Sequence, residues 1–415
     1  MFLKSHIFVG IVFGAALLLS GCASTSFWGK RKDSSEAYGA DARLLVGAER
    51  TSLYLPLLQG KRVGLVVHPA SRIGSQHLVD SLLSRGVQIV RIFSPEHGFR
   101  GSGDAGEILK DETDTRSGLP IISLYGSRKK PFPQDLAGLD ILVFDLQDVG
   151  TRFYTYLSTL HYVLEACAEN GLPLLVLDRP NPNGHYVDGP VLDPKFSSFV
   201  GMHPIPLVHG MTLGELAQMI NGECWLKDSI GCNLTVISCK GYYRGRPYEL
   251  PVAPSPNLPN MRATYLYPSL CLFEGTVVSV GRGTESPFQI YGSPDFPPGP
   301  FHFVPTPMPG AKKPLYEGEI CNGYDLRYFS NEQARSKAAL DLQYLIDFYC
   351  EYPDPIAFFL PNKYFDLLAG TDQLRIQIQQ GWDERSIRAS WQEGLEQFER
   401  QRKRYLIYRD FGPGL

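Results

Sequence analysis

An excess of either charge is missing from this chain, in which 40 lysine and arginine residues stand against 43 aspartate and glutamate residues. A near-neutral chain offers no electrostatic footprint for nucleic acid, so we expect no nucleic-acid partner. The 8 cysteines include no CxxC pair, and the sequence contains no HExxH or comparable spacing of metal ligands. We therefore expect no metal, although His68, His97 and Asp145 are residue types that can bind one.

Motifs for nucleotide binding and for a serine nucleophile are missing where an α/β protein would carry them. No GxGxxG follows the first predicted strand, and Gly281-Arg-Gly283 lacks the lysine of a P-loop. The absence of a GxSxG elbow disfavours an esterase or amidase with an activated serine. We expect a protein that works without a cofactor.

A long apolar run is also missing, because Ile7 to Leu19 is shorter than the roughly 20 helical residues that span a bilayer. With Lys4 before it, the run is typical of a signal peptide, which we place at residues 1–21. It ends in Leu19-Ser20-Gly21-Cys22, which resembles the lipobox whose cysteine accepts diacylglycerol. We predict a lipoprotein bound to a membrane through lipid on Cys22, rather than an ordinary signal peptide with a chance cysteine.

The residues after the cysteine indicate a location and a tether. Ala23-Ser24 contains no aspartate, which by resemblance to Gram-negative lipoproteins implies transport to the outer membrane. The predicted location is the cell envelope, with the protein facing the periplasm. Residues 22–52 are mostly small and polar without apolar periodicity, so we expect a flexible tether.

Apolar strands alternate with amphipathic helices in the first part of the body. Continuous apolar runs at residues 62–67, 88–93 and 140–145 are typical of parallel strands that are covered on both faces. A long helix is predicted from about Tyr154 to Glu169 and is closed by Gly171. The pattern predicts an α/β fold with a Rossmann-like, doubly wound, mostly parallel sheet over residues 53–298.

Prolines are dense between Pro294 and Pro314, which excludes the interiors of helices and sheets there. We expect a domain boundary at residues 298/299 and a second, smaller α+β domain over residues 299–415. Helices are predicted near residues 332–350, 372–380 and 386–404. In the last of these, one buried stripe is formed by Ile387, Trp391, Leu395 and Phe398.

Polar residues follow four of the predicted strands, in turns that begin at His68, Ser94, Asp145 and Asp178. Any one of these turns has an ordinary structural explanation, since Asp, Asn, Gly and Pro are common turn residues. The carboxyl ends of parallel strands share one edge of the sheet, where ligands bind. Together the four turns predict a polar active-site cleft.

Glu96 is the first catalytic candidate, because it follows an apolar strand and a proline, where partial burial could raise a carboxyl pKa into the range of a general acid. Asp145 and Asp148 flank the third turn, and either could supply a second carboxylate unless it pairs with Arg152. Glu165 is a further candidate within the predicted long helix, where it faces either the sheet edge or solvent.

Two polar, turn-rich loops over residues 254–260 and 273–287 are expected to hold the substrate beside these turns. His97 could orient Glu96, contact a sugar hydroxyl or simply cap its turn. The full set of predicted substrate-binding residues is His68, His97, Arg100, Arg152, Tyr154, Arg179, Asn181, Asn257, Glu274, Arg282 and Glu285.

Several motifs occur in a fixed order along the chain. They are Pro95-Glu-His-Gly98, Asp145-Leu-Gln-Asp-Val-Gly150, Arg152-Phe-Tyr-Thr-Tyr156, Asp178-Arg-Pro-Asn-Pro182, Gly210-Met-Thr-Leu-Gly-Glu-Leu216, Pro254-Ser-Pro-Asn257, Leu272-Phe-Glu-Gly275 and Gly281-Arg-Gly-Thr284. With these motifs the chain resembles, over about residues 55–408, the exo-β-N-acetylmuramidases of glycoside hydrolase family 171, formerly a domain of unknown function. It departs from that family at Val67-His68, where Thr-Asn is usual.

The resemblance implies a Rossmann-like catalytic domain with a smaller C-terminal domain. It also implies a peptidoglycan amino-sugar substrate, with release of N-acetylmuramic acid from the non-reducing ends of fragments. Glycoside hydrolysis needs an acid and a second group, either a base about 6.5–9.5 Å away or a nucleophile at about 5 Å. Glu96 fits the acid, and the partner is sought among Asp148, Glu165 and Glu285, unless the substrate's acetamido group takes that role.

Muramic acid carries a lactyl carboxylate that N-acetylglucosamine lacks, and a guanidinium can bind it bidentately. The candidates for this contact are Arg100, Arg152, Arg179 and Arg282. A different class of function stays open, namely an envelope lipoprotein that binds muropeptides and has lost the catalysis. The two hypotheses predict different results for Glu96→Gln. In an enzyme this substitution abolishes turnover and spares binding, whereas a binding protein has no turnover to lose.

Overall fold

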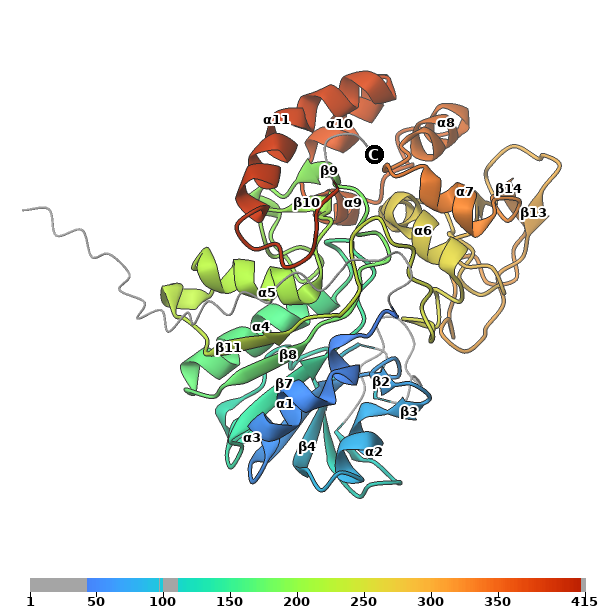
Figure 1. Cartoon of the computed structure of the whole chain (residues 1–415). Helices are drawn as coiled ribbons and strands as arrows, with labels where there is room; N and C mark the ends of the chain where they lie inside the picture. Colours follow the sequence, from blue (N-terminus) through green and yellow to red (C-terminus); the bar gives the residue numbers. More distant parts are fainter. Residues whose placement is uncertain (1–42, 97, 100–110, 412–415) are drawn as a thin grey trace, which may run out of the picture. The chain divides into compact units, whose positions relative to one another are not determined.

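Seven strands form the central sheet of the computed structural model, in the order β11-β8-β7-β1-β4-β6-β5 (Figure 1). Their bounds are β1 Arg62–Val67, β4 Gln88–Ser94, β5 Glu112–Thr113, β6 Pro120–Ser123, β7 Ile141–Asp145, β8 Leu174–Leu177 and β11 Leu234–Ile237. All neighbours in this sheet are parallel except β5 and β6. The chain moves outward from β1 to β6 and returns to β7 on the other side of β1, which confirms the predicted doubly wound, Rossmann-like sheet.

Helices cover both faces of this sheet, as the continuous apolar strands predicted. One face packs with α1 and α2 into a core that contains Leu65 and Tyr54. The other packs with α4 and α5 into a core that contains Val66 and Leu160. The bounds of the elements in this half are η1 Gly47–Glu49, α1 Thr51–Leu58, β2 Arg72–Ile73, β3 Gln76–His77, α2 Leu78–Leu83, α3 Pro133–Leu136, α4 Tyr156–Glu169, β9 Asp188–Val191, η2 Pro194–Phe196, β10 Pro206–Val208, α5 Leu213–Gly222 and η3 Lys227–Ser229.

The structure describes residues 43–96, 98–99 and 111–411. The predicted signal peptide, Cys22, His97 and Arg100 therefore lie outside the described residues. The predicted tether extends too far, because Val46 and Ala48 are already buried. The Tyr54 hydroxyl donates to the carbonyl of Ala48 at 2.8 Å, so this short segment is packed against α1.

The second half of the chain forms a smaller α+β domain, drawn in the upper part of Figure 1. A three-stranded antiparallel sheet has the order β12-β14-β13. The elements are α6 Met261–Leu270, η4 Cys271–Gly275, β12 Ile290–Ser293, β13 His302–Phe303, β14 Cys321–Asp325, α7 Asn331–Ser336, α8 Gln343–Glu351, α9 Tyr364–Ala369, α10 Gln373–Gln379 and α11 Glu384–Arg402. The predicted stripe on α11 is confirmed, since all four of its residues are buried. The boundary at residues 298/299 stays a prediction.

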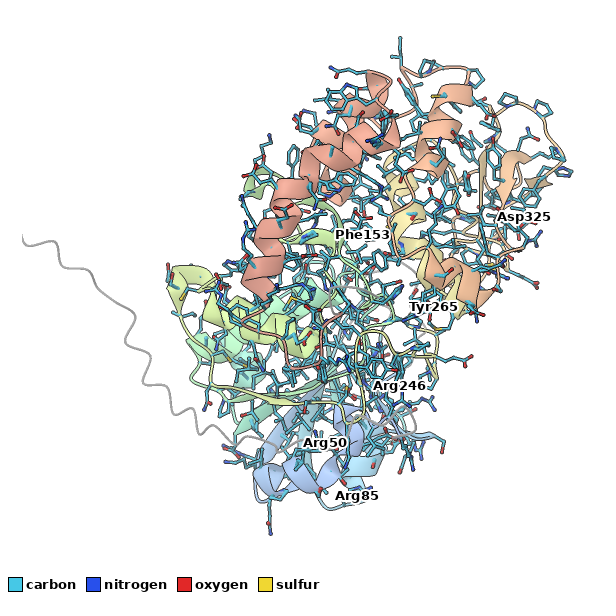
Figure 2. The ribbon with its side chains drawn as sticks, turned by 45° about the horizontal axis from the view of Figure 1, so that its top comes forward. Arg50, Arg85, Phe153, Arg246, Tyr265 and Asp325 are labelled. Atoms are coloured by element: carbon cyan, nitrogen blue, oxygen red, sulfur yellow. The ribbon has the colours of Figure 1, made fainter. Side chains whose placement is uncertain are left out.

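One core continues from the α4 face of the sheet into this second domain. It joins Leu160 on α4 to Phe348 on α8 and Trp391 on α11. Phe153, labelled in Figure 2, lies in this region and packs edge-on against Tyr267 of α6 at 5.3 Å between ring centres. In the part of the chain that the structure describes, every helix is too short or too polar to cross a bilayer.

The single helix predicted near residues 332–350 is wrong, because the chain forms two helices, α7 and α8, with an irregular segment between them. Ala338 has a positive φ of 43°, which a helix does not tolerate. The N–H groups of Leu340 and Asp341 donate to the side chains of Asp188 and Ser269 at 2.7 and 2.8 Å. These tertiary hydrogen bonds replace the helical ones and bury Leu340.

Candidate active site

A cavity of about 700 Å³ lies at the carboxyl ends of the parallel strands, within the size range of small-molecule sites. The sheet domain contributes residues that follow β4, β6 and β7, among them Glu96, Tyr125 and Thr155. Later segments contribute Glu274 from η4 and Tyr364 from α9. The cavity is thus closed by side chains from both halves of the chain.

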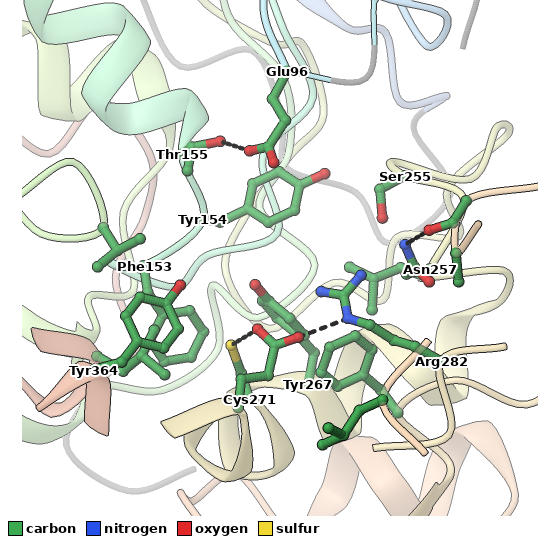
Figure 3. Close-up of a pocket in the computed structure, with 18 of the residues that line it drawn as sticks. Glu96, Phe153, Tyr154, Thr155, Ser255, Asn257, Tyr267, Cys271, Arg282 and Tyr364 are labelled. Atoms are coloured by element: carbon green, nitrogen blue, oxygen red, sulfur yellow. Dashed lines mark hydrogen bonds and ion pairs between the residues drawn. The ribbon is translucent and has the colours of Figure 1, made fainter. Parts of the chain in front are cut away.

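The Glu96 carboxylate is held by hydroxyl groups from neighbouring strand ends. The Thr155 hydroxyl donates to Glu96 Oε2 at 2.7 Å (Figure 3). Burial, the Glu96 charge and a hydrogen bond to it raise the pKa of the Tyr125 phenol, so Tyr125 stays protonated and donates. These donors restrict the rotation of the Glu96 side chain and stabilise one orientation of its carboxyl group.

Two further tyrosines line the wall beneath Glu96. The rings of Tyr154 and Tyr156 pack edge-on with their centres 4.8 Å apart. The Tyr154 hydroxyl donates to the carbonyl of Pro254 at 3.0 Å, which ties this wall to one of the predicted substrate-holding loops. Burial raises the pKa of both phenols, so they remain neutral donors.

Glu274 supplies a second carboxylate in the same cavity. Its Oε1 accepts a charge-assisted hydrogen bond from Arg282 Nε at 2.6 Å, and its Oε2 accepts from the Cys271 thiol at 3.5 Å. Burial raises the pKa of Cys271, which keeps the thiol protonated for this contact. In Figure 3 Arg282 lies across the cavity from Glu96. The arginine fixes the orientation of the Glu274 carboxylate.

The structure brings only some of the predicted site residues together. Those that line the cavity are Glu96, Tyr154, Asn257, Glu274 and Arg282. Those that are described but do not line it are His68, Asp148, Arg152, Glu165, Arg179, Asn181 and Glu285. The reasons differ from residue to residue.

Asp148 and Glu165, two of the three predicted catalytic partners of Glu96, do not line the cavity. Asp148 is buried and accepts from the N–H of Gly150 at 2.7 Å, and burial raises its pKa to about 7. Glu165 accepts from Lys130 Nζ at 2.7 Å and from the N–H of Lys227 at 2.8 Å. Burial raises the pKa of Glu165, but these donors outweigh it and hold the pKa below its usual value.

Arg152 and Arg179 are both engaged by the protein itself. Arg179 forms a two-pronged pair with Asp145, at 2.5 Å from Nε to Oδ1 and 2.9 Å from Nη2 to Oδ2. Arg152 is fully buried and donates to four backbone carbonyls, so the pairing of Arg152 with an aspartate that we considered is wrong. Neither guanidinium is available to a sugar in this structure.

Three further predicted residues serve local structure or face solvent. His68 Nε2 accepts from the N–H of Gln147 at 2.9 Å, which links the ends of β1 and β7. Asn181 Nδ2 donates to the carbonyl of Met211 at 2.9 Å. Glu285 is exposed and lies outside the cavity lining.

Other cavity residues were not predicted from the sequence. Thr155 belongs to the motif Arg152-Phe-Tyr-Thr-Tyr156, but nothing in the sequence distinguishes its hydroxyl group from that of any other turn residue. Tyr125 follows the short strand β6, which carried no polar signal. Lys312 and Lys313 lie in the proline-dense segment, which was interpreted only as a boundary.

A doubly wound fold whose strand-end cavity contains two carboxylates has the residue types that a glycoside hydrolase requires. The sequence matches the family models of the N-terminal domain of exo-β-N-acetylmuramidase NamZ over residues 63–262 and of its C-terminal domain over residues 265–408. The chain belongs to this NamZ family, which confirms the resemblance of its motifs.

Similar proteins cover almost the whole chain. A peptidoglycan β-N-acetylmuramidase NamZ from Bacillus subtilis (strain 168) is 40% identical over 375 residues, which are 86% of this chain and 89% of that protein. A DUF1343 family protein from Bacteroides fragilis has a crystal structure with a TM-score of 0.83 and 48% identity, covering 89% of this chain and 100% of that one. A second such protein from the same species has a TM-score of 0.76 and 29% identity, covering 88% and 99%.

Proposed function

We propose that this protein is a peptidoglycan exo-β-N-acetylmuramidase, which hydrolyses terminal N-acetylmuramic acid from the non-reducing ends of glycan or muropeptide fragments. The observation that carries the proposal is the placement of Glu96 and Glu274 in one sugar-sized cavity. Membership of the NamZ family and the similarity to a peptidoglycan β-N-acetylmuramidase support the same reaction.

Glu96 acts as the general acid. It comes from the turn after β4 and faces the cavity, where its carboxyl group can protonate the oxygen that leaves with the next sugar. Thr155 and Tyr125 hold it in place through their hydroxyl groups. Positioned donors of this kind keep the acid aligned while charge develops on the sugar.

Glu274 is the second carboxylate of the reaction. Breaking the glycosidic bond leaves positive charge on the ring, and a second carboxylate in the cavity stabilises it or activates the water that attacks. The Arg282 contact at 2.6 Å holds the Glu274 carboxylate in place. This assignment replaces Asp148, Glu165 and Glu285, none of which lines the cavity.

The test uses a chromogenic N-acetylmuramide as substrate, with Glu96→Gln, Glu274→Gln and the control Glu393→Gln. Glu393 is exposed on α11, remote in sequence from every cavity segment. We expect each cavity variant to lose about 10²–10⁴-fold in kcat and to retain binding of N-acetylmuramic acid, and the control to match the wild type.

Two results would contradict this function or its assignment. If the wild-type protein bound N-acetylmuramic acid but left the substrate intact while the Bacillus subtilis relative cleaved it, the binding-protein hypothesis would replace the enzyme. Full activity of Glu96→Gln would remove Glu96 from the acid role and leave the activity itself standing.

We also propose that the enzyme is a lipoprotein of the cell envelope, anchored in the outer membrane through Cys22 and facing the periplasm. The support is the sequence Leu19-Ser20-Gly21-Cys22 after a short apolar run. A Cys22→Ser protein is expected to leave the membrane fraction and to keep its kcat in solution. Membrane fractionation of Cys22→Ser identical to that of the wild type would exclude the lipid anchor.

A further inference from the structure

The cavity contains cations that the proposed reaction does not use. Arg282 is occupied by Glu274, and the buried Arg152 and Arg179 do not line the cavity. Among the described residues, two further cationic side chains line the cavity, Lys312 and Lys313. Both lie on a tight turn that belongs to neither carboxylate's segment.

This turn, residues 308–314, is firmly attached on one side to the loop that contains Asn257. Met308 and Ala311 exchange backbone hydrogen bonds at 3.1 and 2.9 Å, which close the turn. Asn257 Nδ2 donates to the carbonyl of Gly310 at 2.8 Å. Gly310 has a φ of 89°, and a Cβ there would lie 2.5 Å from Pro256 Cβ, so only glycine allows this approach.

On its other side the same turn packs against the loop of Arg282. The N–H of Thr306 donates to the carbonyl of Gly283 at 2.8 Å. A Cβ on Gly283 would lie 2.6 Å from Pro314 Cβ, so the two segments are in direct contact. Asn257 and Arg282 lie across the cavity from Glu96 in Figure 3. The attachments therefore place the turn on the wall opposite the proposed acid.

The lactyl carboxylate of N-acetylmuramic acid is a group that these lysines could bind. The acid must contact the oxygen on C1, whereas the lactyl ether is attached at C3 and extends away from the leaving group. Its carboxylate would leave water for a cavity in which Arg282 is already paired with Glu274. A charge that loses its hydration needs a partner of opposite sign, so a further cation is expected on the lactyl side.

We propose that Lys313, assisted by Lys312, binds the lactyl carboxylate and makes the cavity selective for N-acetylmuramic acid over N-acetylglucosamine. This inference rests on the proposed function. Lys313 is exposed at the wall, and no carboxylate of the described residues forms an ion pair with it. A lysine ammonium is a point charge on a flexible stem, so it can follow a freely rotating lactyl group.

The test compares three chromogenic substrates: the N-acetylmuramide, its lactyl methyl ester and the N-acetylglucosaminide. The full-length variants are Lys313→Ala, Lys313→Arg, the double variant Lys312→Ala/Lys313→Ala, and the control Lys61→Ala. Lys61 is exposed in the turn before β1, at the opposite end of the strands from the cavity.

We expect Lys313→Ala to raise KM for the N-acetylmuramide about 10-fold, the size of one charge-assisted hydrogen bond, with kcat nearly unchanged. The kcat/KM for the neutral methyl ester and for the N-acetylglucosaminide should stay at the wild-type value, so that selectivity falls. The double variant should lose more, and Lys313→Arg should recover most of the affinity because it keeps the charge.

The outcomes separate this inference from the function on which it rests. An equal loss on the charged substrate and its methyl ester would show that the turn only shapes the cavity, and unchanged KM in the double variant would show that the lysines are not contacts. Either result would overturn the inference and leave the muramidase activity in place. Failure of the wild type on all three substrates would instead contradict the proposed function.

Discussion

Replacing Arg152 should unfold the protein rather than impair substrate binding. Its Nη1 donates to the carbonyls of Pro190 and Ile205 at 2.9 and 2.8 Å, and its Nη2 to those of Leu368 and Ala369 at 3.1 and 2.7 Å. The last two are the final residues of α9, where the negative end of the helix dipole favours a cation. This explains how the guanidinium can be fully buried without a carboxylate partner among the described residues.

The magnitude follows from these four contacts. A hydrogen bond to a charged group contributes about 1.5–3 kcal/mol, so four contribute about 6 kcal/mol at the lower bound. Folded proteins are stable by only about 5–15 kcal/mol. Arg152→Met removes these donors from all four carbonyls, of which that of Ile205 also accepts from the N–H of Leu192 at 3.2 Å, and should remove most of the stability. Arg152→Lys keeps the charge but has fewer donors and a different geometry, so we expect an intermediate loss.

The assay is urea unfolding, followed by circular dichroism, for these two variants beside Arg62→Met. Arg62 also forms a two-pronged contact, with Asp140, but it is exposed, and its replacement should leave the midpoint almost unchanged. Gly370→Ala offers an independent perturbation, since a Cβ there would lie 2.4 Å from Arg152 Nη2. A wild-type midpoint for Arg152→Met together with weakened binding of N-acetylmuramic acid would refute this reasoning.

Two other buried carboxyl groups give further predictions. Because the folded-state pKa of Asp148 is about 7 against 3.8 for the free side chain, its ionisation costs stability as the pH rises through that window. Asp148→Asn should therefore unfold at a higher urea concentration at pH 8 and at nearly the same concentration at pH 4; equal shifts at both pH values would contradict the raised pKa. Glu165→Gln should keep its kcat on the N-acetylmuramide and lose about 1–3 kcal/mol of stability through Lys130 and the N–H of Lys227. A kcat below one hundredth of the wild type, with normal stability, would return Glu165 to the catalytic candidates.

The fold was predictable because the strands that form the sheet carry an unambiguous signal. β1, β7 and β8 are short apolar runs that only a sheet covered on both faces can bury. The irregular segment between α7 and α8 carried no such signal. Its helix-forming composition is overridden by hydrogen bonds from Leu340 and Asp341 to residues far away in the sequence.

The site was only partly predictable, for a related reason. The sequence predicts which polar residues lie at one edge of the sheet. It does not predict which of them form hydrogen bonds or ion pairs with one another there. Arg179 pairs with Asp145, and His68 accepts from the N–H of Gln147 in the turn after β7. Many polar groups at this edge of the sheet therefore bind one another and not a ligand. Glu96 lines the cavity, where the Thr155 hydroxyl donates to its carboxylate and the Tyr125 phenol lies beside it.

The motif Arg152-Phe-Tyr-Thr-Tyr156 contains both residues that line the cavity and a residue that only supports the fold. Thr155 and Tyr156 line the cavity beside Glu96, whereas Arg152 points away and holds the end of α9. The first residue of α9, Tyr364, lines the same cavity from the other domain. Because the two carboxylates and the lysine turn come from different parts of the chain, the cavity exists only while these parts stay packed. An arginine that never touches the sugar is therefore a condition for its hydrolysis.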